Sequence, residues 1–276
     1  MRDANTPQLP IVVGIDGSQA AIRAAEWAVD EAVSREVPLR LVEVIPQQAE
    51  PAPLAAVGNV RMEFEYGETA LGIASAAVTA SGQPVKVETA ILRGDPATAL
   101  IAESRDAEMV CVGSTGIGRF ARALLGSTVA ELAEAASSPV AIIRTQQRRP
   151  KPDSALIVVA VNDSPGNDDV VEQAIREAQL RHAPILALGV WRQDLGEMPY
   201  GELARRVQFW ERHYPSVQFH TRATRTGIAD LLDVSDSRIQ LAVIGSTDID
   251  QVRESHWATS APHSRHAECS VLIVRS

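Results

Sequence analysis

The stretch "VCVGSTGIGRFARALLGSTVAEL", residues 110–132, joins a strand-like apolar run to a helix-like run through a segment rich in glycine. Its opening nearly recurs as "AVIGSTDIDQ" at residues 242–251. A continuous aliphatic run that ends at a glycine is typical of a parallel strand buried on both faces. The recurrence indicates that the chain contains one structural unit twice.

The repeat extends over most of the chain. Blocks of similar sequence recur at an offset of 146 residues, which shortens to 132 residues further along. The aligned pairs are 11–18 with 157–164, 31–44 with 177–190, and 113–115 with 245–247. We therefore predict two homologous domains, residues 1–145 and 154–276, joined by the polar, proline-containing segment "TQQRRPKPDS".

Strand-like and helix-like patterns alternate along each half. In the first half, Ser18 is placed to cap a helix whose alanines recur at helical spacing, and a loop rich in Pro and Ala covers 46–58. We expect strands at 10–16, 38–45, 85–92, 107–114 and 139–144, with helices at 18–37, near 60–81, at 96–105 and at 125–137. Alternation of this kind predicts an α/β fold, with right-handed crossovers and a parallel sheet covered on both faces.

Composition excludes several functional classes. The formal net charge of −9 disfavours nucleic acid as a partner, because a phosphate backbone would be repelled. No apolar run approaches the roughly 20 residues of a membrane span, and the N-terminal "MRDANTPQLP" lacks the apolar segment of a secretory signal. Cys111 lies in an apolar run and is expected to be a buried thiol. A cytoplasmic globular protein is the expectation.

The glycine spacing predicts a binding loop where ligands collect in open parallel sheets, beyond the carboxyl ends of the strands. Gly113 and Gly116 allow a sharp turn and a close backbone approach, and 126–128 opens a helix whose free N–H groups would receive phosphate oxygens. Arg119 could neutralise phosphate charge, and Asp16 could accept a hydrogen bond from a ribose hydroxyl. The alternative is that these glycines only connect a strand to a helix. The segment is not a kinase or GTPase phosphate loop, because no Lys follows its last glycine.

Three features together resemble the ATP-binding branch of the universal stress proteins: "VVGIDGS" near the start, the tandem halves, and the spacing Gly113-x2-Gly116-x9-Gly126-Ser127. The resemblance covers nearly the whole chain. It implies two tandem open five-stranded parallel sheets of the adenine nucleotide alpha hydrolase-like, Rossmann-like type. It also implies ATP, alone or with Mg²⁺, as the ligand.

The resemblance assigns Asp16 to the adenosine portion of ATP and the backbone near Gly14 and Val44 to the flanks of the base. The glycine loop would wrap the phosphates, and the residues from Gly126 to Val129 would close over them. The full set of implied ATP contacts is Gly14, Asp16, Val44, Gly113, Ser114, Thr115, Gly116, Ile117, Gly118, Arg119, Gly126, Ser127, Thr128 and Val129.

The second half departs from this pattern. Asn162 stands where Asp16 does, Asp248 replaces Gly116, and Ala258 replaces Gly126. A carboxylate 4 Å from a phosphate charge is unfavourable by about 4 kcal/mol at an effective dielectric of 20. We therefore expect the second domain to lack ATP and to serve packing. The family implies pairing through the last strands, as an intrachain pseudo-dimer or a homodimer.

Other candidate sites are weaker. His263, His266 and Cys269 have ligand-type side chains at a spacing of three, but no second ligand pair is evident, so no metal site is predicted. The acidic pair 168–169 is expected to begin a helix, and Glu131 with Glu134 to be exposed. No Ser-His-Asp arrangement is present.

Three functional classes remain open. The first is an ATP-binding regulatory protein of the stress response, whose conformation or partner binding follows nucleotide occupancy. The second is a slow ATPase, against which stands the lack of a recognisable catalytic base beside the loop. The third is a structural dimerisation module that binds no nucleotide.

Overall fold

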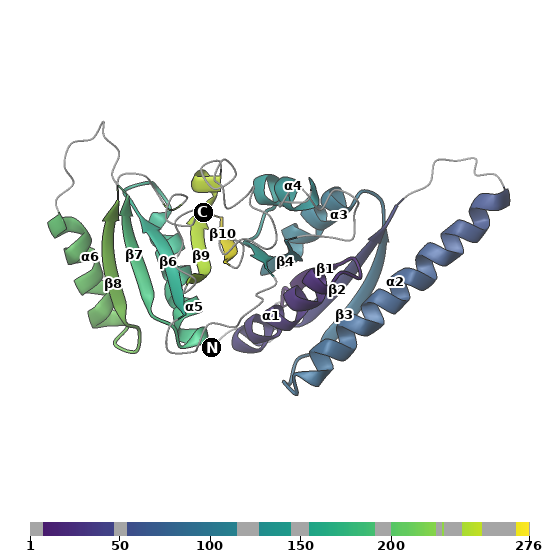
Figure 1. The fold of residues 1–276 in the computed structure, drawn as a ribbon, viewed down its shortest axis with the longest axis horizontal. Coiled ribbons are helices and arrows are strands. Elements are labelled where there is room, and N and C mark those ends of the chain that lie inside the picture. Colours follow the sequence, from purple (N-terminus) through teal and green to yellow (C-terminus); the bar gives the residue numbers. More distant parts are fainter. Residues whose placement is uncertain are drawn as a thin grey trace. The chain divides into compact units, whose positions relative to one another are not determined.

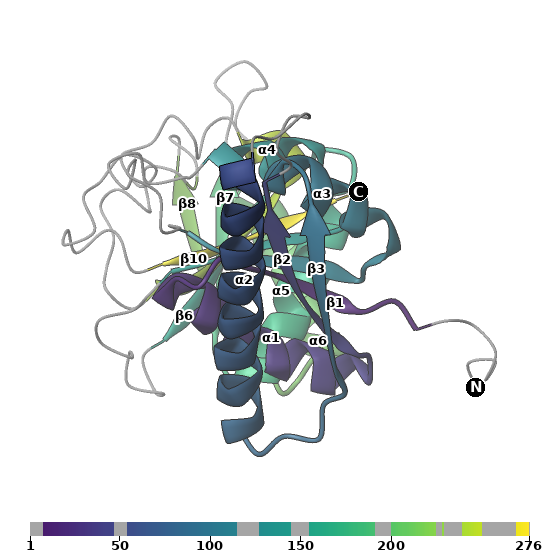
Figure 2. The same cartoon turned by 90° about the vertical axis from the view of Figure 1, so that its right-hand side faces the viewer.

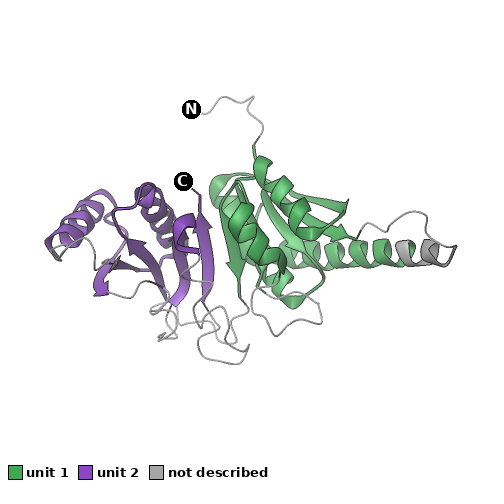
Figure 3. Cartoon of the chain, turned by 90° about the horizontal axis from the view of Figure 1, so that it is seen from above, with its two compact units in different colours: residues 1–121, 125–145 green, residues 122–124, 146–276 purple. Residues whose placement is uncertain are grey.

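The computed structural model describes residues 8–46, 54–114, 127–144, 155–190, 200–224, 228, 239–249 and 269–275. The described residues up to 144 form one compact unit, and those from 155 onward form another (Figure 3). The segment predicted to join the two domains lies outside the described residues, so the predicted domain boundaries stay a prediction. The two units are described separately below.

Unit 1 is a five-stranded parallel sheet in the order β3-β2-β1-β4-β5. Its helices α1 and α2 pack together on one face of the sheet, and α3 and α4 pack together on the other (Figure 1). The strands are β1 (Ile11–Ile15), β2 (Leu39–Ile45), β3 (Val87–Arg93), β4 (Met109–Gly113) and β5 (Val140–Ile143). The helices are α1 (Gln19–Arg35), α2 (Leu54–Ala80), α3 (Pro96–Glu103) and α4 (Ser127–Ala135), and a short 3-10 turn follows α3 at Ser104–Asp106.

Unit 2 repeats this architecture, with the strand order β8-β7-β6-β9-β10 and parallel pairing between neighbours. Its strands are β6 (Leu156–Val161), β7 (Ile185–Val190), β8 (Phe219–Thr224), β9 (Ile239–Gly245) and β10 (Ser270–Val274). The helices are α5 (Asn167–Arg181) and α6 (Tyr200–His213), with a 3-10 turn at Ser246–Asp248. The predicted α/β class and the two tandem five-stranded parallel sheets are therefore confirmed.

The sequence patterns account for most of these elements. Ser18 caps α1 as predicted, since its Oγ accepts a hydrogen bond from the Ala21 N–H at 3.1 Å. Asp95 caps α3 in the same manner, and Cys111 is fully buried in β4. The helix expected near 60–81 instead begins at Leu54, within the predicted loop. Pro53 is the last proline before it, and the following Leu-Ala-Ala sequence has high helix propensity. Figure 2 shows this long helix running alongside β2 and β3.

An identical ion pair is buried in both units. Arg35 lies 3.0 Å from Glu31 within α1, and Arg181 lies 2.9 Å from Glu177 within α5. Both glutamate side chains are at most 2% exposed, and removing either arginine would leave a buried charge uncompensated. These residues are among the identical positions of the sequence repeat, so the two units share a polar core feature as well as a strand order.

No helix in the described part of the chain combines the length and the apolarity needed to cross a bilayer.

The end of β4 lies unusually close to α1. A Cβ built on Gly113 would be 2.6 Å from the Ala20 carbonyl carbon and 2.7 Å from the Ala21 nitrogen. Both atoms belong to the backbone, so no rotamer change can relieve the overlap. Gly113 was interpreted from the sequence as a turn residue, but it is the last residue of a regular strand. The absence of a side chain there is required by helix–sheet packing.

We predict that Gly113→Ala lowers the free energy of unfolding by at least about 2 kcal/mol, because an added Cβ must displace the first turn of α1. Gly245 ends β9 at the equivalent position of unit 2, and its nearest neighbour would be a Val170 methyl group at 3.4 Å. Gly245→Ala is therefore the matched control, with an expected loss below about 1 kcal/mol. Denaturant unfolding of both variants measures the difference, and equal losses would contradict the packing explanation.

Candidate functional site

The candidate site of unit 1 is the sheet edge at which β1, β2 and β4 end. The chain leaves β1 toward β2 on one side, and β4 lies on the other side, so this is the point where the strand order reverses. Ile15 pairs with Glu43, and Val13 pairs with Cys111. Continuing these registers places Asp16 level with Val44 on one side and Ser114 on the other. The structure thus brings together three of the segments that the sequence predicted, at the edge where ligands of such sheets bind.

Asp16 holds a tight turn between β1 and α1. Its Oδ1 accepts a hydrogen bond from the Ser18 N–H at 3.0 Å, and Gly17 between them has a φ of 77°. This positive φ favours glycine, because an L side chain would be strained there. The Tyr66 hydroxyl of α2 donates to the Asp16 carbonyl at 3.3 Å. The Asp16 side chain is therefore positioned by the backbone, and its loop is fixed from α2.

β4 and α4 supply the other described residues of the site. The Ser114 N–H donates to the Ile143 carbonyl at 2.9 Å, which extends the pairing of β4 with β5 by one residue. This amide is therefore used by the sheet and does not point a free donor at a phosphate. In the first turn of α4, Ser127 is exposed, Thr128 is half-buried and Val129 is buried. That turn itself contains no acidic residue, so none of its own side chains offsets the positive end of the helix dipole.

Several predicted contacts cannot be placed. Thr115, Gly116, Ile117, Gly118, Arg119 and Gly126 lie outside the described residues. Gly14 has a packing role, because a Cβ there would be 3.0 Å from a Leu100 methyl group of α3. Val44 lies in β2, where it pairs with Leu92 of β3.

Glu43 and Tyr66 are site residues that the sequence reasoning missed. Glu43 is 6% exposed, and its Oε2 atom is buried without a hydrogen-bond partner among the described residues. Burial, and then the nearby Asp16 carboxylate, raise the pKa of Glu43 from 4.5 to about 7. Burial and the same two carboxyl groups raise the pKa of Tyr66. An acidic residue one position before a predicted contact, in a strand whose only other polar residue is Arg40, was the signal available in the sequence.

The corresponding edge of unit 2 keeps the turn, and the hollow beside it is small. Asn162 Oδ1 accepts a hydrogen bond from the Ser164 N–H at 2.9 Å, as Asp16 does from Ser18. The carbonyl of Asn162 accepts from Arg206 Nη1 at 2.9 Å, so an arginine of α6 takes the place of the Tyr66 hydroxyl. The hollow lined by Asn162, 164–167, Val170 and 245–248 measures only about 10 Å³. That volume is about what one water molecule requires.

Acidic side chains at the edge of unit 2 further distinguish it from the edge of unit 1. The first turn of α5 carries Asp168 and Asp169, as the sequence predicted, and Asp168 Oδ1 accepts from Arg206 Nη2 at 2.7 Å. Asp248 lies beside the hollow, and burial raises its pKa, partly offset by a hydrogen bond from the Gly245 N–H. An anion approaching this edge would meet acidic side chains in the first turn of α5, whereas the equivalent helix of unit 1, α1, has none in its first turn.

Comparison with known proteins agrees with this fold and with its duplication. The Universal stress protein family model matches residues 9–144. Universal stress protein Rv2624c of Mycobacterium tuberculosis is 50% identical over 265 residues, which cover 96% of each chain. The chain belongs to the universal stress protein family.

Further relatives extend over both halves of this universal stress protein. Universal stress protein Rv3134c of Mycobacterium tuberculosis is 39% identical over 277 residues, covering 98% of this chain and 97% of the relative. The crystal structure of a universal stress protein from Archaeoglobus fulgidus DSM 4304 superposes with a TM-score of 0.69 at 17% identity. It covers 96% of both chains, so the likeness in fold extends over both halves.

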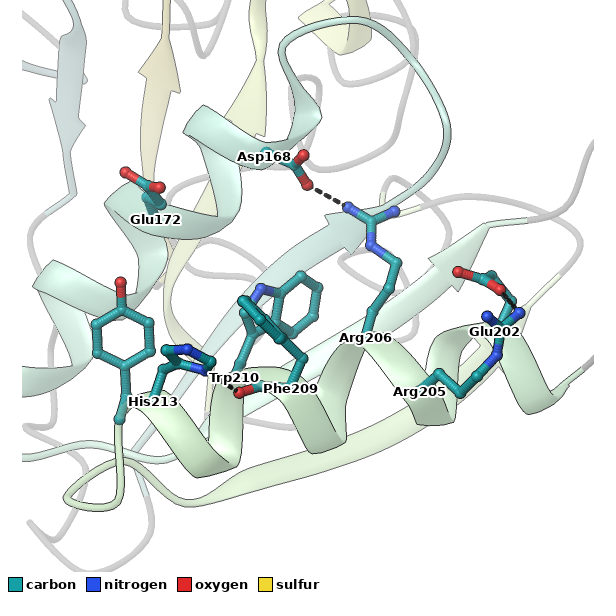
Figure 4. Close-up of a pocket in the computed structure, with 9 residues that line it drawn as sticks. Asp168, Glu172, Glu202, Arg205, Arg206, Phe209, Trp210 and His213 are labelled. Carbon is teal, nitrogen blue, oxygen red and sulfur yellow. Dashed lines mark hydrogen bonds and ion pairs between the residues drawn. The ribbon is translucent and has the colours of Figure 1, made fainter.

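Unit 2 of this universal stress protein also contains a groove of about 520 Å³ between α5 and α6 (Figure 4). Its α6 wall is aromatic, with Trp210 buried and Phe209 exposed, and the Arg206 guanidinium lies 5.3 Å from the Trp210 ring centroid. The acidic side chains of the groove are paired: Asp168 with Arg206, Glu172 with Arg176, and Glu202 with Arg205. The groove therefore offers little uncompensated charge to a ligand.

The ligand-type side chains noted in the sequence can be compared with the described part of the structure. Among the described residues, no three His, Cys, Asp or Glu side chains cluster as metal ligands would. Cys269 is buried, and His263 and His266 lie outside the described residues. Glu131 and Glu134 are exposed on α4, as predicted.

We predict that Glu43→Gln stabilises the protein at about pH 8 but not at about pH 4. In the wild type, the unfolded chain releases the Glu43 proton near its ordinary pKa of 4.5, whereas the folded chain keeps it until about 7. The free energy of unfolding of the wild type therefore falls as pH rises between these values. At 1.36 kcal/mol per pKa unit, the fall is roughly 3 kcal/mol. Urea unfolding across this pH range measures the loss, and parallel profiles for variant and wild type would contradict it.

Proposed function

We propose that this universal stress protein binds one ATP per chain, in unit 1, and acts as a nucleotide-responsive regulatory protein of the stress response. The observation that carries the proposal is the position of the spaced glycine motif. The motif begins at Gly113, the last residue of β4, next to the point where the strand order reverses, and its final serine opens α4. A strand end followed by a helix N-terminus is a favourable setting for phosphate oxygens.

The rest of the edge supports an adenine nucleotide. Asp16 is held in a fixed turn beside Val44, where a carboxylate can accept hydrogen bonds from ribose hydroxyls. The first turn of α4 is free of acidic side chains, so its dipole is available to the phosphates. Because Ser114 donates its N–H to Ile143, the phosphate donors of the loop are expected to begin at Thr115.

Unit 2 is proposed to bind no nucleotide. Beside its edge, the Arg206 guanidinium donates hydrogen bonds to the Asn162 carbonyl and to Asp168. The remaining hollow of about 10 Å³ is far smaller than the several hundred cubic ångströms of ordinary ligand pockets. Retaining this unit without a ligand is consistent with a role in packing, and pairing through the last strands stays a prediction.

Regulation requires that a partner or a conformation distinguish the ATP-bound state from the free state. Hydrolysis is not needed for this. Multiple-turnover phosphate release tests the alternative of a slow ATPase: a rate above buffer, lost on Gly116→Asp, would favour an enzyme. Mass analysis of any nucleotide that copurifies with the chain tests the ligand itself.

We predict that equilibrium titration with a fluorescent ATP analogue saturates at about one nucleotide per chain, and that Gly116→Asp weakens binding by at least about 100-fold. The variant copies Asp248 of unit 2 and places a carboxylate near the phosphates, at about 4 kcal/mol per charge pair at 4 Å. Gly72→Asp is the control, because Gly72 lies on the outer surface of α2 with open space around it. It adds the same charge away from the proposed site.

Two outcomes would overturn the proposal. Absence of saturable binding in the wild type would leave a structural module as the remaining class. Unchanged affinity in Gly116→Asp, with Gly72→Asp also unchanged, would show that the glycine loop does not hold the phosphates.

A further inference from the structure

Glu43 occupies an unusual position within unit 1. It lies in β2 between Ile15 of β1 and Ile91 of β3, two residues before the strand ends. The backbone of α2 passes directly over it, because a Cβ on Gly67 would be 3.2 Å from Glu43 Cγ. The residue is 6% exposed, and one carboxyl oxygen is buried with no hydrogen-bond partner in the described part of the chain. A carboxyl group left in this state is costly in ionised form, so its position calls for an explanation.

The elements around Glu43 provide acidic neighbours. Asp16, in the turn after β1, interacts with it electrostatically, and so does Tyr66 of α2. From β3, the directly paired residue is Ile91, while the Arg93 guanidinium lies 5.3 Å from the Phe64 ring centroid. The start of α1 lies at this edge, and residues 18–21 there are uncharged. Arg35 lies at the opposite end of the helix, where it pairs with Glu31.

The consequence is a carboxyl group that changes charge near neutral pH. Burial and the Asp16 carboxylate together raise the pKa of Glu43 to about 7. Below that pH the side chain is neutral and carries an O–H donor. Above it, a second negative charge is added beside Asp16, at the edge where we propose that an anionic nucleotide binds.

We propose that Glu43 makes nucleotide binding in unit 1 proton-linked: the site holds ATP while Glu43 is neutral and releases it as Glu43 ionises. The inference rests on the proposed ATP site and adds its regulation. The bound polyanion opposes ionisation of Glu43, and by reciprocity ionised Glu43 opposes the polyanion. Affinity is then highest below about pH 7 and falls by up to about tenfold for each pH unit above it.

The test is ATP affinity at about pH 6 and about pH 8, with the wild type and Glu43→Gln measured side by side. We expect the wild-type affinity to fall about tenfold more than that of Glu43→Gln over this interval. Gln cannot ionise but keeps the size and a hydrogen-bond donor, so it should bind at both pH values. Comparing the two proteins with the same ligand removes the titration of the ATP phosphates themselves.

Glu88→Gln is the matched control, because it removes one carboxylate from β3 of the same unit. A hydrogen bond from Lys86 lowers the pKa of Glu88, so this group does not titrate near neutrality. Its pH profile should follow that of the wild type. If Glu88→Gln flattened the pH profile of ATP affinity as much as Glu43→Gln does, the effect would come from net charge. That result would overturn the assignment to Glu43.

A second measurement does not depend on comparing affinities across pH. Calorimetric titration at about pH 7.5, in two buffers of different ionisation enthalpy, should show greater proton uptake on ATP binding by the wild type than by Glu43→Gln. Equal uptake, or parallel affinity profiles, would overturn the proton linkage while leaving ATP binding intact. Absence of saturable binding in both proteins would instead remove the proposed function, and the linkage with it.

Discussion

The contact between the end of β4 and the start of α1 is the constraint on which the rest of unit 1 depends. Only a residue without a side chain can occupy position 113, because the backbone of residues 20 and 21 lies within 2.7 Å of where its Cβ would be. The alanine-rich inner face of α1 makes this approach possible, since Ala20, Ala21, Ala24 and Ala25 are all buried. The same contact brings the turn at Asp16 beside the strand end that begins the glycine motif, so packing and site geometry share one cause.

The two units show what is kept and what is lost after a duplication. The turn after the first strand survives the change from Asp16 to Asn162, because either side chain accepts the same backbone hydrogen bond. The helix that covers this edge uses a neutral hydroxyl from Tyr66 in unit 1 and a charged guanidinium from Arg206 in unit 2. The hydroxyl makes this one bond to the loop, whereas the arginine also donates a hydrogen bond to Asp168 at the start of α5.

Sequence patterns predicted the alternation of strands and helices and the cap at Ser18, because these depend on local propensity and on periodic burial, and the internal repeat predicted the duplication. They also placed Asp16 and Val44 at one sheet edge. They did not reveal the reason for Gly113, which depends on the distance between two elements that are remote in sequence. Glu43 was missed for a different reason. In a sheet covered on both faces, the alternation of apolar and polar residues along a strand does not tell which polar side chain is buried. The phosphate-loop residues between Ser114 and Ser127 remain predictions from the motif alone.

The hydrogen bond from the Ser114 N–H to the Ile143 carbonyl marks the end of the described pairing between β4 and β5, before the glycine loop. In unit 2, β9 stays in register with β10 up to the pair of Gly245 and Val274, so strand pairing also extends to the position equivalent to Gly113. Substitutions beyond these anchoring positions need not disturb the pairing of the strands behind them. The segment beyond them, where we propose that the phosphates bind, can therefore change in sequence while the sheet that supports it is kept.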